Sequence, residues 1–179
     1  MNTQDLKALI RNVPDFPKPG IIYRDITTLL QSPAGFHAVI QTFLDRYQNK
    51  DFQIEAIAGI ESRGFIYASV CAHALQLPLI LIRKKGKLPA LTYSHDYALE
   101  YGENSLEMHT DAISKGSRIL LMDDLLATGG TAQAACKLIE KAQGHVVEIA
   151  TMIELQFLNG RANLAPIPVF SQIVYEDPN

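Results

Sequence analysis

The sequence predicts an α/β fold: an open, mainly parallel, twisted β-sheet with helices on its faces. Short apolar runs typical of buried strands occur at 54–60, 79–82, 118–122 and 146–155. Stretches with a helical spacing of apolar residues follow the first and third of these runs. A strand, a helix and a second strand in that order form a unit whose two strands are normally parallel.

Three helices are expected within this framework. Apolar residues recur at helical spacing over 36–47, and Ser32-Pro33 supplies a start signal for that helix. A second helix begins after the first predicted strand and covers about 64–77. The third has an apolar face over 135–142, and Gly144 is expected to end it, because glycine is favoured just past a helix end.

Two segments fall outside the repeating unit. Residues 13–33 contain four prolines and are expected to form an ordered, largely extended cap, so residues 1–33 are interpreted as a hood over a core at 34–179. Residues 86–105 form a long connection. A connection of that length in a compact domain usually has a function, often as a lid, so a long flexible lid loop is expected there.

Composition is that of an ordinary globular protein. The chain has 179 residues, which suits a single domain, with 47% hydrophobic and 20% charged residues and a formal net charge of -3. This charge argues against general nucleic-acid binding, which needs a basic surface. Cys71 and Cys136 fall in alanine-rich helical stretches, so they are interpreted as small packing residues rather than as a disulfide, a catalytic thiol or zinc ligands.

Targeting and membrane signals are not evident. The N-terminal stretch MNTQDLKALIRNV is short and amphipathic and carries Asp5, unlike the apolar core of a signal peptide. No apolar run approaches the length that spans a bilayer. A cytoplasmic protein without a membrane partner is therefore expected.

The most informative stretch is ILLMDDLLATGGT at 119–131, where a predicted strand ends in two acids and a loop of small residues opens a helix. Glycines let the backbone approach a ligand, and threonines offer hydroxyl groups. Free amides at the start of the helix would point at an anion that the helix dipole also favours, so a phosphate monoester is expected. The residues assigned to this phosphate loop are Ala127, Thr128, Gly129, Gly130 and Thr131.

The two acids before the loop, Asp123 and Asp124, define the rest of the ligand. No Lys-Ser or Lys-Thr pair follows the glycines, so the loop is not that of a nucleoside-triphosphatase. Carboxylates beside a phosphate site would repel it unless they face hydroxyl groups or a metal ion, and vicinal ribose hydroxyls donate well to ionised carboxylates. A ribose 5-phosphate fits both features. The alternative is a solvated turn with a capping threonine.

This stretch resembles the signature of the phosphoribosyltransferases that use phosphoribosyl pyrophosphate (PRPP). The resemblance extends along almost the whole chain and points to the adenine phosphoribosyltransferase family. The motifs that carry it are FPKPGIIYRDI (16–26), ESRGF (61–65), RKKGKLP (83–89), YALEYG (97–102), and IEL (153–155) with LNGR (158–161).

The resemblance implies a pyrophosphate-binding loop at Glu61, Ser62 and Arg63, with a cis peptide bond between the first two and with Arg63 taking part in catalysis. Glu61 stands where family members commonly have aspartate. Arg63 could otherwise form a surface ion pair. Arg83 and Lys87 resemble residues that reach the pyrophosphate, Lys87 from a neighbouring subunit, which implies a homodimer.

The resemblance also assigns the base site and the lid. Glu100 matches a catalytic lid carboxylate that meets the base, and Tyr101 matches a residue that closes over the ribosyl centre. In the hood, Ile22 and Arg24 would offer main-chain groups to the adenine edge, and Leu155 with Ile22 would cover its faces. A salt bridge that holds the hood is the alternative for Arg24.

The reaction implied by the resemblance is adenine plus PRPP giving AMP and pyrophosphate, a step of purine salvage. Mg²⁺ is the expected cofactor, held mainly by substrate oxygens and waters, with Asp123 or Asp124 bound through water and no direct protein ligand. Two alternatives remain. The same chemistry could act on hypoxanthine, guanine or orotate, or the chain could be a regulator that senses PRPP or a nucleotide without catalysis.

Overall fold

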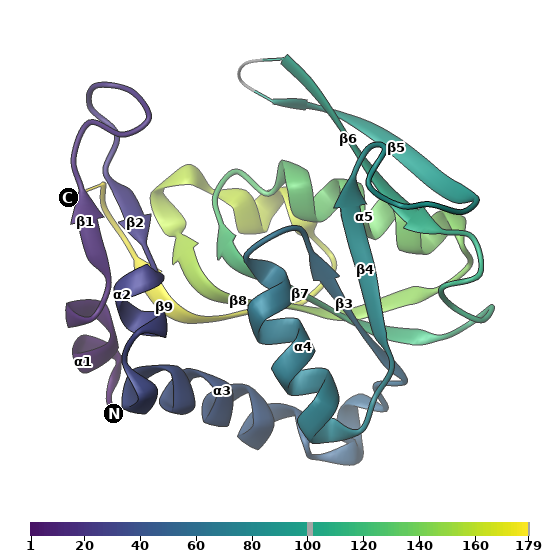
Figure 1. Cartoon of the computed structure of the whole chain (residues 1–179), viewed down its shortest axis with the longest axis horizontal. Helices are drawn as coiled ribbons and strands as arrows, with labels where there is room; N and C mark the ends of the chain where they lie inside the picture. Colours follow the sequence, from purple (N-terminus) through teal and green to yellow (C-terminus); the bar gives the residue numbers. More distant parts are fainter. Residues whose placement is uncertain (100–101, 179) are drawn as a thin grey trace.

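The computed structural model describes residues 1–99 and 102–178, with side chains for all of them except residues 50, 98, 99 and 102–104. Its centre is a seven-stranded sheet in the order β5-β6-β4-β3-β7-β8-β9 (Figure 1). The pairs β3–β4, β3–β7, β7–β8 and β8–β9 are parallel, whereas β6 is antiparallel to both β4 and β5. The predicted open, mainly parallel α/β sheet is therefore confirmed.

The four predicted strands correspond to β3 (Ala56–Ile60), β4 (Leu79–Lys84), β7 (Arg118–Leu126) and β8 (His145–Leu155). The outer strand β9 (Val169–Tyr175) was not predicted, although it is rich in β-branched and aromatic residues. It pairs with β8 and completes that side of the sheet.

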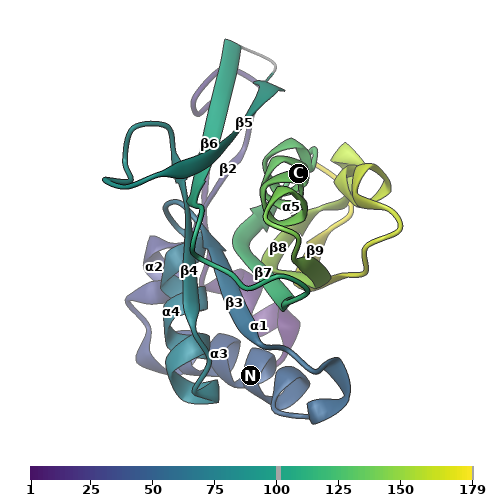
Figure 2. The same ribbon diagram turned by 90° about the vertical axis from the view of Figure 1, so that its right-hand side faces the viewer.

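Helices cover both faces of the sheet, and the apolar residues of its strands alternate between them. Ile57 of β3 packs in one core with α3 (Pro33–Tyr47) and α4 (Gly64–Leu75). Its neighbours Ala56 and Ala58 pack in a second core with α5 (Gly130–Lys141). Figure 2 shows this arrangement, with α3 and α4 on one side of the strands and α5 on the other.

The starts of the predicted helices are confirmed, and α5 ends close to the predicted place, but Gly144 does not take the left-handed position expected of it. The side chain of Ser32 accepts a hydrogen bond from the Gly35 amide, as a helix cap does. After α5, the left-handed position is taken by Gln143, with φ 64°, and not by Gly144. The Gly144 amide instead donates to the Ile139 carbonyl at 2.9 Å, one position later in the capping motif.

The N-terminal hood contains more regular structure than an extended cap. Its elements are α1 (Thr3–Ala8), β1 (Arg11–Val13), β2 (Tyr23–Asp25) and α2 (Thr27–Leu30). The two strands pair antiparallel as a separate small sheet. The prolines lie mainly in the connection between the strands, where the Phe16-Pro17 bond is cis.

The segment expected as a long lid loop is mostly a β-hairpin. β5 (Thr92–Leu99) and β6 (Gly102–His109) pair along their whole length, and β6 joins β4 at Arg83 and Lys84. The hairpin projects from the carboxyl end of β4 beyond the rest of the sheet (Figure 2). Tyr93 and Tyr97 alternate with polar residues and pack on the second core.

Three short 3₁₀-helices complete the described chain: η1 (Lys50–Phe52), η2 (Gln156–Leu158) and η3 (Gly160–Leu164). Both cysteines are free and lie in α4 and α5, as expected of packing residues. Within the described ranges, no helix combines the length and apolar character needed to cross a membrane.

Candidate active site

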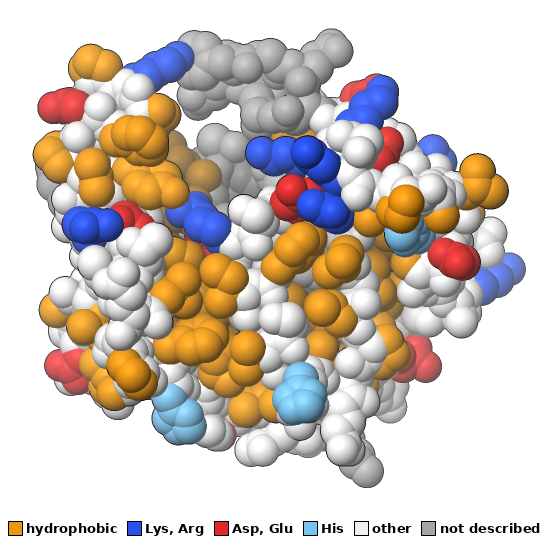
Figure 3. Space-filling view, viewed as in Figure 1, with side chains coloured by type: hydrophobic (Ala, Val, Ile, Leu, Met, Phe, Trp, Pro, Cys, Tyr) orange, Lys and Arg blue, Asp and Glu red, His pale blue; other side chains and the backbone are white. Residues whose placement is uncertain are grey.

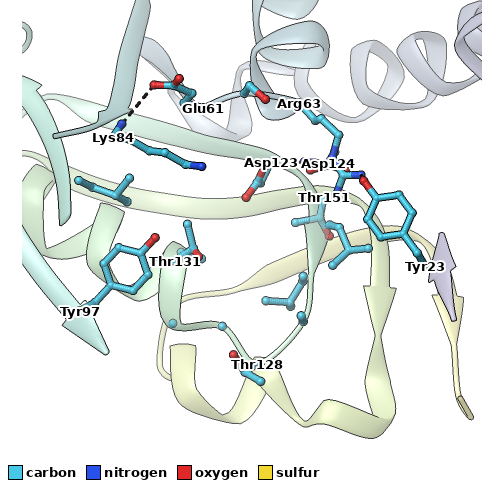
Figure 4. A pocket seen from close by; sticks show the side chains of 18 residues that line it. Tyr23, Glu61, Arg63, Lys84, Tyr97, Asp123, Asp124, Thr128, Thr131 and Thr151 are labelled. Carbon is cyan, nitrogen blue, oxygen red and sulfur yellow. Dashed lines mark hydrogen bonds and ion pairs between the residues drawn. The ribbon is translucent and has the colours of Figure 1, made fainter. Parts of the chain in front are cut away.

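A cavity of about 480 Å³ opens at the carboxyl ends of β3, β4 and β7, the position at which open α/β sheets bind ligands. Figure 4 shows how side chains from the hood, the sheet, α5 and the hairpin converge on it. The lining residues that matter below are Tyr23, Glu61, Ser62, Arg63, Lys84, Tyr97, Asp123, Asp124, Ala127, Thr128, Gly129, Gly130, Thr131 and Thr151.

The predicted phosphate loop lines one side of this cavity. Gly129 has φ +87°, in the left-handed region, and precedes the first residue of α5, Gly130. No side chain caps the start of this helix. The first amides of a helix have no partner within it, so those of Gly130 and Thr131 are available to an anion in the cavity.

Asp123 and Asp124 both reach the cavity, where their charges are crowded. The Asp124 amide donates to Asp123 Oδ1 at 2.9 Å, and Asp124 is only 5% exposed. Burial, together with the charge of Asp124, raises the pKa of Asp123 well above its usual range. Burial also raises the pKa of Asp124, although the Arg63 guanidinium opposes this shift. Ribose hydroxyls that donate to these carboxylates would relieve the crowding.

Arg63 connects the two acids to the hood. Its Nε lies 2.8 Å from Asp124 Oδ2, but no N–H in the described part of the chain is directed at that buried oxygen. Arg63 also donates to the Tyr23 hydroxyl and stacks over the Tyr23 ring at 5.3 Å. The ion-pair alternative considered for Arg63 therefore describes this state, with the qualification that its partner is a cavity carboxylate and not a surface one.

Glu61 and Ser62 also border the cavity, and the peptide bond between them is cis, as predicted. The Glu61 carboxylate accepts hydrogen bonds from Arg83 Nε at 3.0 Å and from the Lys84 amide at 3.2 Å. Burial tends to raise the pKa of Glu61, but these hydrogen bonds outweigh it and lower the pKa. Glu61 therefore ties this loop to the end of β4 as a charged group.

Among the cationic residues at the end of β4 and just after it (Arg83, Lys84, Lys85 and Lys87), Lys84 lines the cavity and neither Arg83 nor Lys87 does. Arg83 binds Glu61 and donates to the Lys87 carbonyl at 3.0 Å, and Lys87 is exposed. Lys84 points into the cavity (Figure 4), and the sequence analysis missed it. Strand alternation was the available signal, because Ile80 and Ile82 are buried on the face that Lys84 shares.

The three residues predicted to bind the base, Ile22, Arg24 and Leu155, do not line this cavity. Ile22 and Leu155 are half-buried. The Arg24 side chain donates to Asn12 Oδ1 at 2.7 Å and to the Pro178 carbonyl at 3.0 Å, so it ties the hood to the segment that follows the last strand. Those contacts leave untested the expectation that its main chain meets the base.

Both lid residues of the prediction, Glu100 and Tyr101, lie outside the described residues. Tyr97 and Tyr23 line the cavity and were missed, the first on the hairpin and the second on the hood. Thr151 on β8 was also missed. Tyr23 and Tyr97 lie within the motifs at 16–26 and 97–102, but only the folded sheet shows that their side chains, and that of Thr151, face the same cavity as the phosphate loop.

Within the described ranges, no group of three or more histidine, cysteine or acidic side chains is arranged to hold a metal ion. The donor set that is present, two adjacent carboxylates beside a phosphate loop, fits Mg²⁺. This ion binds through one or two carboxylates, retains waters and takes substrate oxygens as its other ligands.

Sheet topology, a phosphate loop at a helix start and paired acids at the end of its strand define the class of phosphoribosyltransferases. A family model described as "Phosphoribosyl transferase domain" matches residues 25–165. The chain is 57% identical over 175 residues to an adenine phosphoribosyltransferase of Chloroflexus aurantiacus, covering 98% of this chain and 100% of the relative. The chain belongs to the adenine phosphoribosyltransferase family.

Solved structures agree with this assignment. An adenine phosphoribosyltransferase from Rhodothermus marinus is 46% identical with a TM-score of 0.89, covering 97% of this chain and 98% of that one. The Saccharomyces cerevisiae enzyme, complexed with an imino-altritol bisphosphate and adenine, is 36% identical with a TM-score of 0.90, covering 96% and 98%. The Giardia lamblia enzyme, complexed with 9-deazaadenine, is 35% identical with a TM-score of 0.92, covering 99% of each chain.

Proposed function

We propose that this protein transfers the 5-phosphoribosyl group of PRPP to adenine, giving AMP and pyrophosphate. The observation that carries the proposal is the cavity in which a phosphate loop, two adjacent carboxylates and two cationic side chains, Arg63 and Lys84, face one another. This is the set of groups that a phosphorylated sugar with an anionic leaving group requires. Relatives named for the adenine reaction at 48–57% identity support the choice of base.

In this proposal the amides and hydroxyls from Ala127 to Thr131 hold the 5-phosphate, and Asp123 and Asp124 accept hydrogen bonds from the ribose hydroxyls. Burial raises the pKa of both acids because it disfavours their charged forms, so hydroxyl groups of the sugar that donate to them would stabilise the ionised carboxylates. Substrate binding would therefore give the two neighbouring carboxylates hydrogen-bond donors that offset the cost of their burial and mutual repulsion.

The leaving pyrophosphate would lie against the Glu61–Arg63 loop. Arg63 is paired with Asp124 without ligand, and the sugar hydroxyls would take over that carboxylate and leave the guanidinium to the pyrophosphate. Lys84 points into the same space (Figure 4). Arg83 binds Glu61 of this loop, and Lys87 would reach the pyrophosphate of a neighbouring subunit. Catalysis is then mainly electrostatic, because these groups stabilise charge that develops as the bond breaks.

Mg²⁺ would be held mainly by substrate oxygens and waters, with Asp123 or Asp124 bound through water. When bound, the ion supplies further neutralisation of the pyrophosphate charge.

The base would lie between the hood and the sheet, with Ile22 and Leu155 on its faces and main-chain groups of Ile22 and Arg24 at its edge. The C1′–oxygen bond breaks with its electron pair leaving on pyrophosphate, and adenine N9 bonds to C1′ from the opposite face. Glu100 accepts the imidazole proton, and Tyr101 closes the lid over the reacting centre.

A homodimer and a cytoplasmic location belong to the same proposal. Lys87 is exposed and lies outside the cavity of its own chain, as expected for a residue that serves a neighbouring subunit. Hydrophobic side chains gather over α4 and β4 (Figure 3), among them Leu79 and Leu81, which are each 39% exposed. An exposed apolar surface next to the cationic residues at 83–87 is a suitable contact for a second copy of the chain.

The deciding experiment measures AMP formation from PRPP and adenine, with hypoxanthine, guanine and orotate as competing bases, with and without Mg²⁺. We expect turnover with adenine that depends on the metal ion. Turnover of a different base would reassign the substrate. Binding of PRPP without turnover of any base would favour the nucleotide-sensing regulator.

A further inference from the structure

The LNGR motif at 158–161 has no part in the function as proposed above, although the segment that contains it touches the phosphate loop. Residues 156–164 follow β8 as η2 and η3, and η3 packs beside α5 (Figure 2). None of these residues lines the cavity. The segment therefore contacts the loop from the side away from the ligand.

Gly160 makes the closest contact. A Cβ atom on Gly160 would lie 2.0 Å from the Ala127 carbonyl oxygen and 3.0 Å from the Gly129 nitrogen. A Cβ atom on Gly129 would in turn lie 2.7 Å from the Gly160 carbonyl oxygen. These neighbours are backbone atoms that cannot rotate away, so the two glycines permit an approach that no other residue pair allows.

Asn163 makes the second contact. Its Nδ2 donates to the Thr128 carbonyl at 2.9 Å, and its own carbonyl accepts from Gln133 Nε2 at 3.2 Å. The segment is anchored on both sides of this bond. Leu164 is 3% exposed in the core beneath α5, and Arg161 Nε donates to buried Glu154 at 3.1 Å.

These contacts fix the orientation of two peptide groups, those that follow Ala127 and Thr128. In a trans peptide the carbonyl and the following N–H point in opposite directions. Because the Ala127 and Thr128 carbonyls are held against the 156–164 segment, the Thr128 and Gly129 amides are directed the other way. A phosphate in the cavity requires that orientation, since carbonyl oxygens facing it would repel it.

We propose that Gly160 and Asn163 are positioning residues for the phosphate loop. They hold the Ala127 and Thr128 carbonyls away from the cavity and so fix the amides that receive the 5-phosphate. The proposal deepens the function above and rests on it. It makes the segment 156–164, which contains the LNGR motif, a specificity element for the phosphorylated end of the substrate, with no direct ligand contact.

The test compares Asn163→Ala and Gly160→Ala with two controls. Gln41→Ala removes an exposed side-chain amide that donates to Asp45 on α3. Gly144→Ala inserts a Cβ against the Ile113 and Ile139 side chains at the far end of α5. Ribose 5-phosphate is titrated calorimetrically into each protein, and KM is measured separately for PRPP and for adenine.

We expect the Kd of ribose 5-phosphate to rise ~5-fold in Asn163→Ala, the scale of one lost hydrogen bond. The rise should exceed ~10-fold in Gly160→Ala, where backbone atoms must move. KM for PRPP should rise in parallel while KM for adenine stays constant, and both controls should bind as the wild type does. A purely structural role would not separate the two substrates in this way.

Unchanged ribose 5-phosphate binding in Asn163→Ala overturns the proposal, even if Gly160→Ala fails to fold. Equal losses for PRPP and adenine also overturn it. Failure of the proposed function gives a different result, because wild-type protein would then bind ribose 5-phosphate, with the variants weakened, but form no AMP. Wild-type protein that does not bind ribose 5-phosphate contradicts the phosphate-loop assignment itself.

Discussion

The hood and the phosphate side of the cavity use charged residues in opposite ways. In the hood, the Asp25 carboxylate accepts from Arg11 Nε at 2.9 Å and from the Thr27 amide at 2.9 Å. In the cavity, Asp123 and Asp124 stand side by side, and one oxygen of Asp124 receives no directed N–H from the described residues.

The pKa values of these acids express the difference. Hydrogen bonds from Thr27 and Arg11 lower the pKa of Asp25 from 3.8 to about 2, whereas burial raises the pKa of Asp123 and Asp124. Satisfied charges stabilise a fold, while charges left short of partners indicate where a ligand binds. If this contrast separates structural from functional residues, substitutions in the hood should change stability and substitutions in the cavity should change substrate binding or turnover.

The largest effect is expected from the lid. Glu100→Ala should lower kcat by ~10²-fold or more, because a general acid or base typically contributes that factor. Steady-state rates of AMP formation at saturating PRPP and adenine measure it. Glu140→Ala, which removes an exposed carboxylate of α5, is the matched control and should retain full activity. A loss of only a few-fold would remove Glu100 from the mechanism.

Asp124→Asn should raise KM for PRPP by ~10- to 100-fold, because hydrogen bonds to a charged group contribute more than neutral ones. Asparagine keeps the size of the side chain but loses the charge that attracts the ribose hydroxyls. Initial rates with PRPP varied at saturating adenine measure the effect, and KM for adenine serves as the internal control. Unchanged PRPP kinetics would contradict the ribose assignment.

The phosphate side could be predicted from sequence because it is contiguous. Asp123, Asp124 and residues 127–131 all come from one strand, the loop after it and the start of the next helix. Because these residues are neighbours in sequence, the local backbone alone determines how they are arranged. Tyr23 and Lys84 were missed for the opposite reason. Each lies far along the chain, and which side faces the cavity depends on strand direction and alternation, which are properties of the assembled sheet.

The hairpin shows a different limit of sequence reading. Tyr93 and Tyr97 lie on the same face of β5 and pack against the second core, as apolar residues of a half-buried strand do. However, β6 pairs both with β5 and with β4, and the spacing of residues within one strand does not show which strands it will pair with. Whether such a segment is a loop or a hairpin is decided by its pairing with the edge at Arg83 and Lys84, a tertiary contact.

A smaller effect is expected in the hood. Asp25→Asn should lower the free energy of unfolding by about 1–2 kcal/mol at pH 7, because the lowered pKa of Asp25 shows that its charged form stabilises the folded state. The expected loss is kept small because Arg11, one of its partners, is exposed and solvent screens the interaction. The stabilisation is fully present above pH 3.8 and is lost as the pH falls towards about 2.

Thermal unfolding of wild type and Asp25→Asn between pH 2 and pH 7 measures this effect. The two melting curves should converge at the acid end and separate towards neutrality. Asp45→Asn, an exposed acid of α3 that accepts from Gln41, is the matched control and should follow wild type throughout. A difference that stays constant with pH would mean that the Asp25 contacts act through packing and not through charge.

The most diagnostic effect is expected at Asp123, with the opposite sign. Its raised pKa means that the folded protein binds more protons than the unfolded chain, so the wild type loses stability as pH rises from about 4. Asp123→Asn removes that loss and keeps an oxygen to accept the Asp124 amide. The ligand-free variant should therefore melt above wild type at neutral pH and match it near pH 3, although its affinity for PRPP falls.

Ligand-site residues often trade stability for function in this way. Melting of both proteins across pH 3–8, repeated with ribose 5-phosphate, separates the two contributions, because the ligand should stabilise wild type more than the variant. A ligand-free variant that is less stable than wild type at neutral pH would place Asp123 with Asp25 among the structural acids. The contrast between hood and cavity would then not distinguish the two kinds of residue.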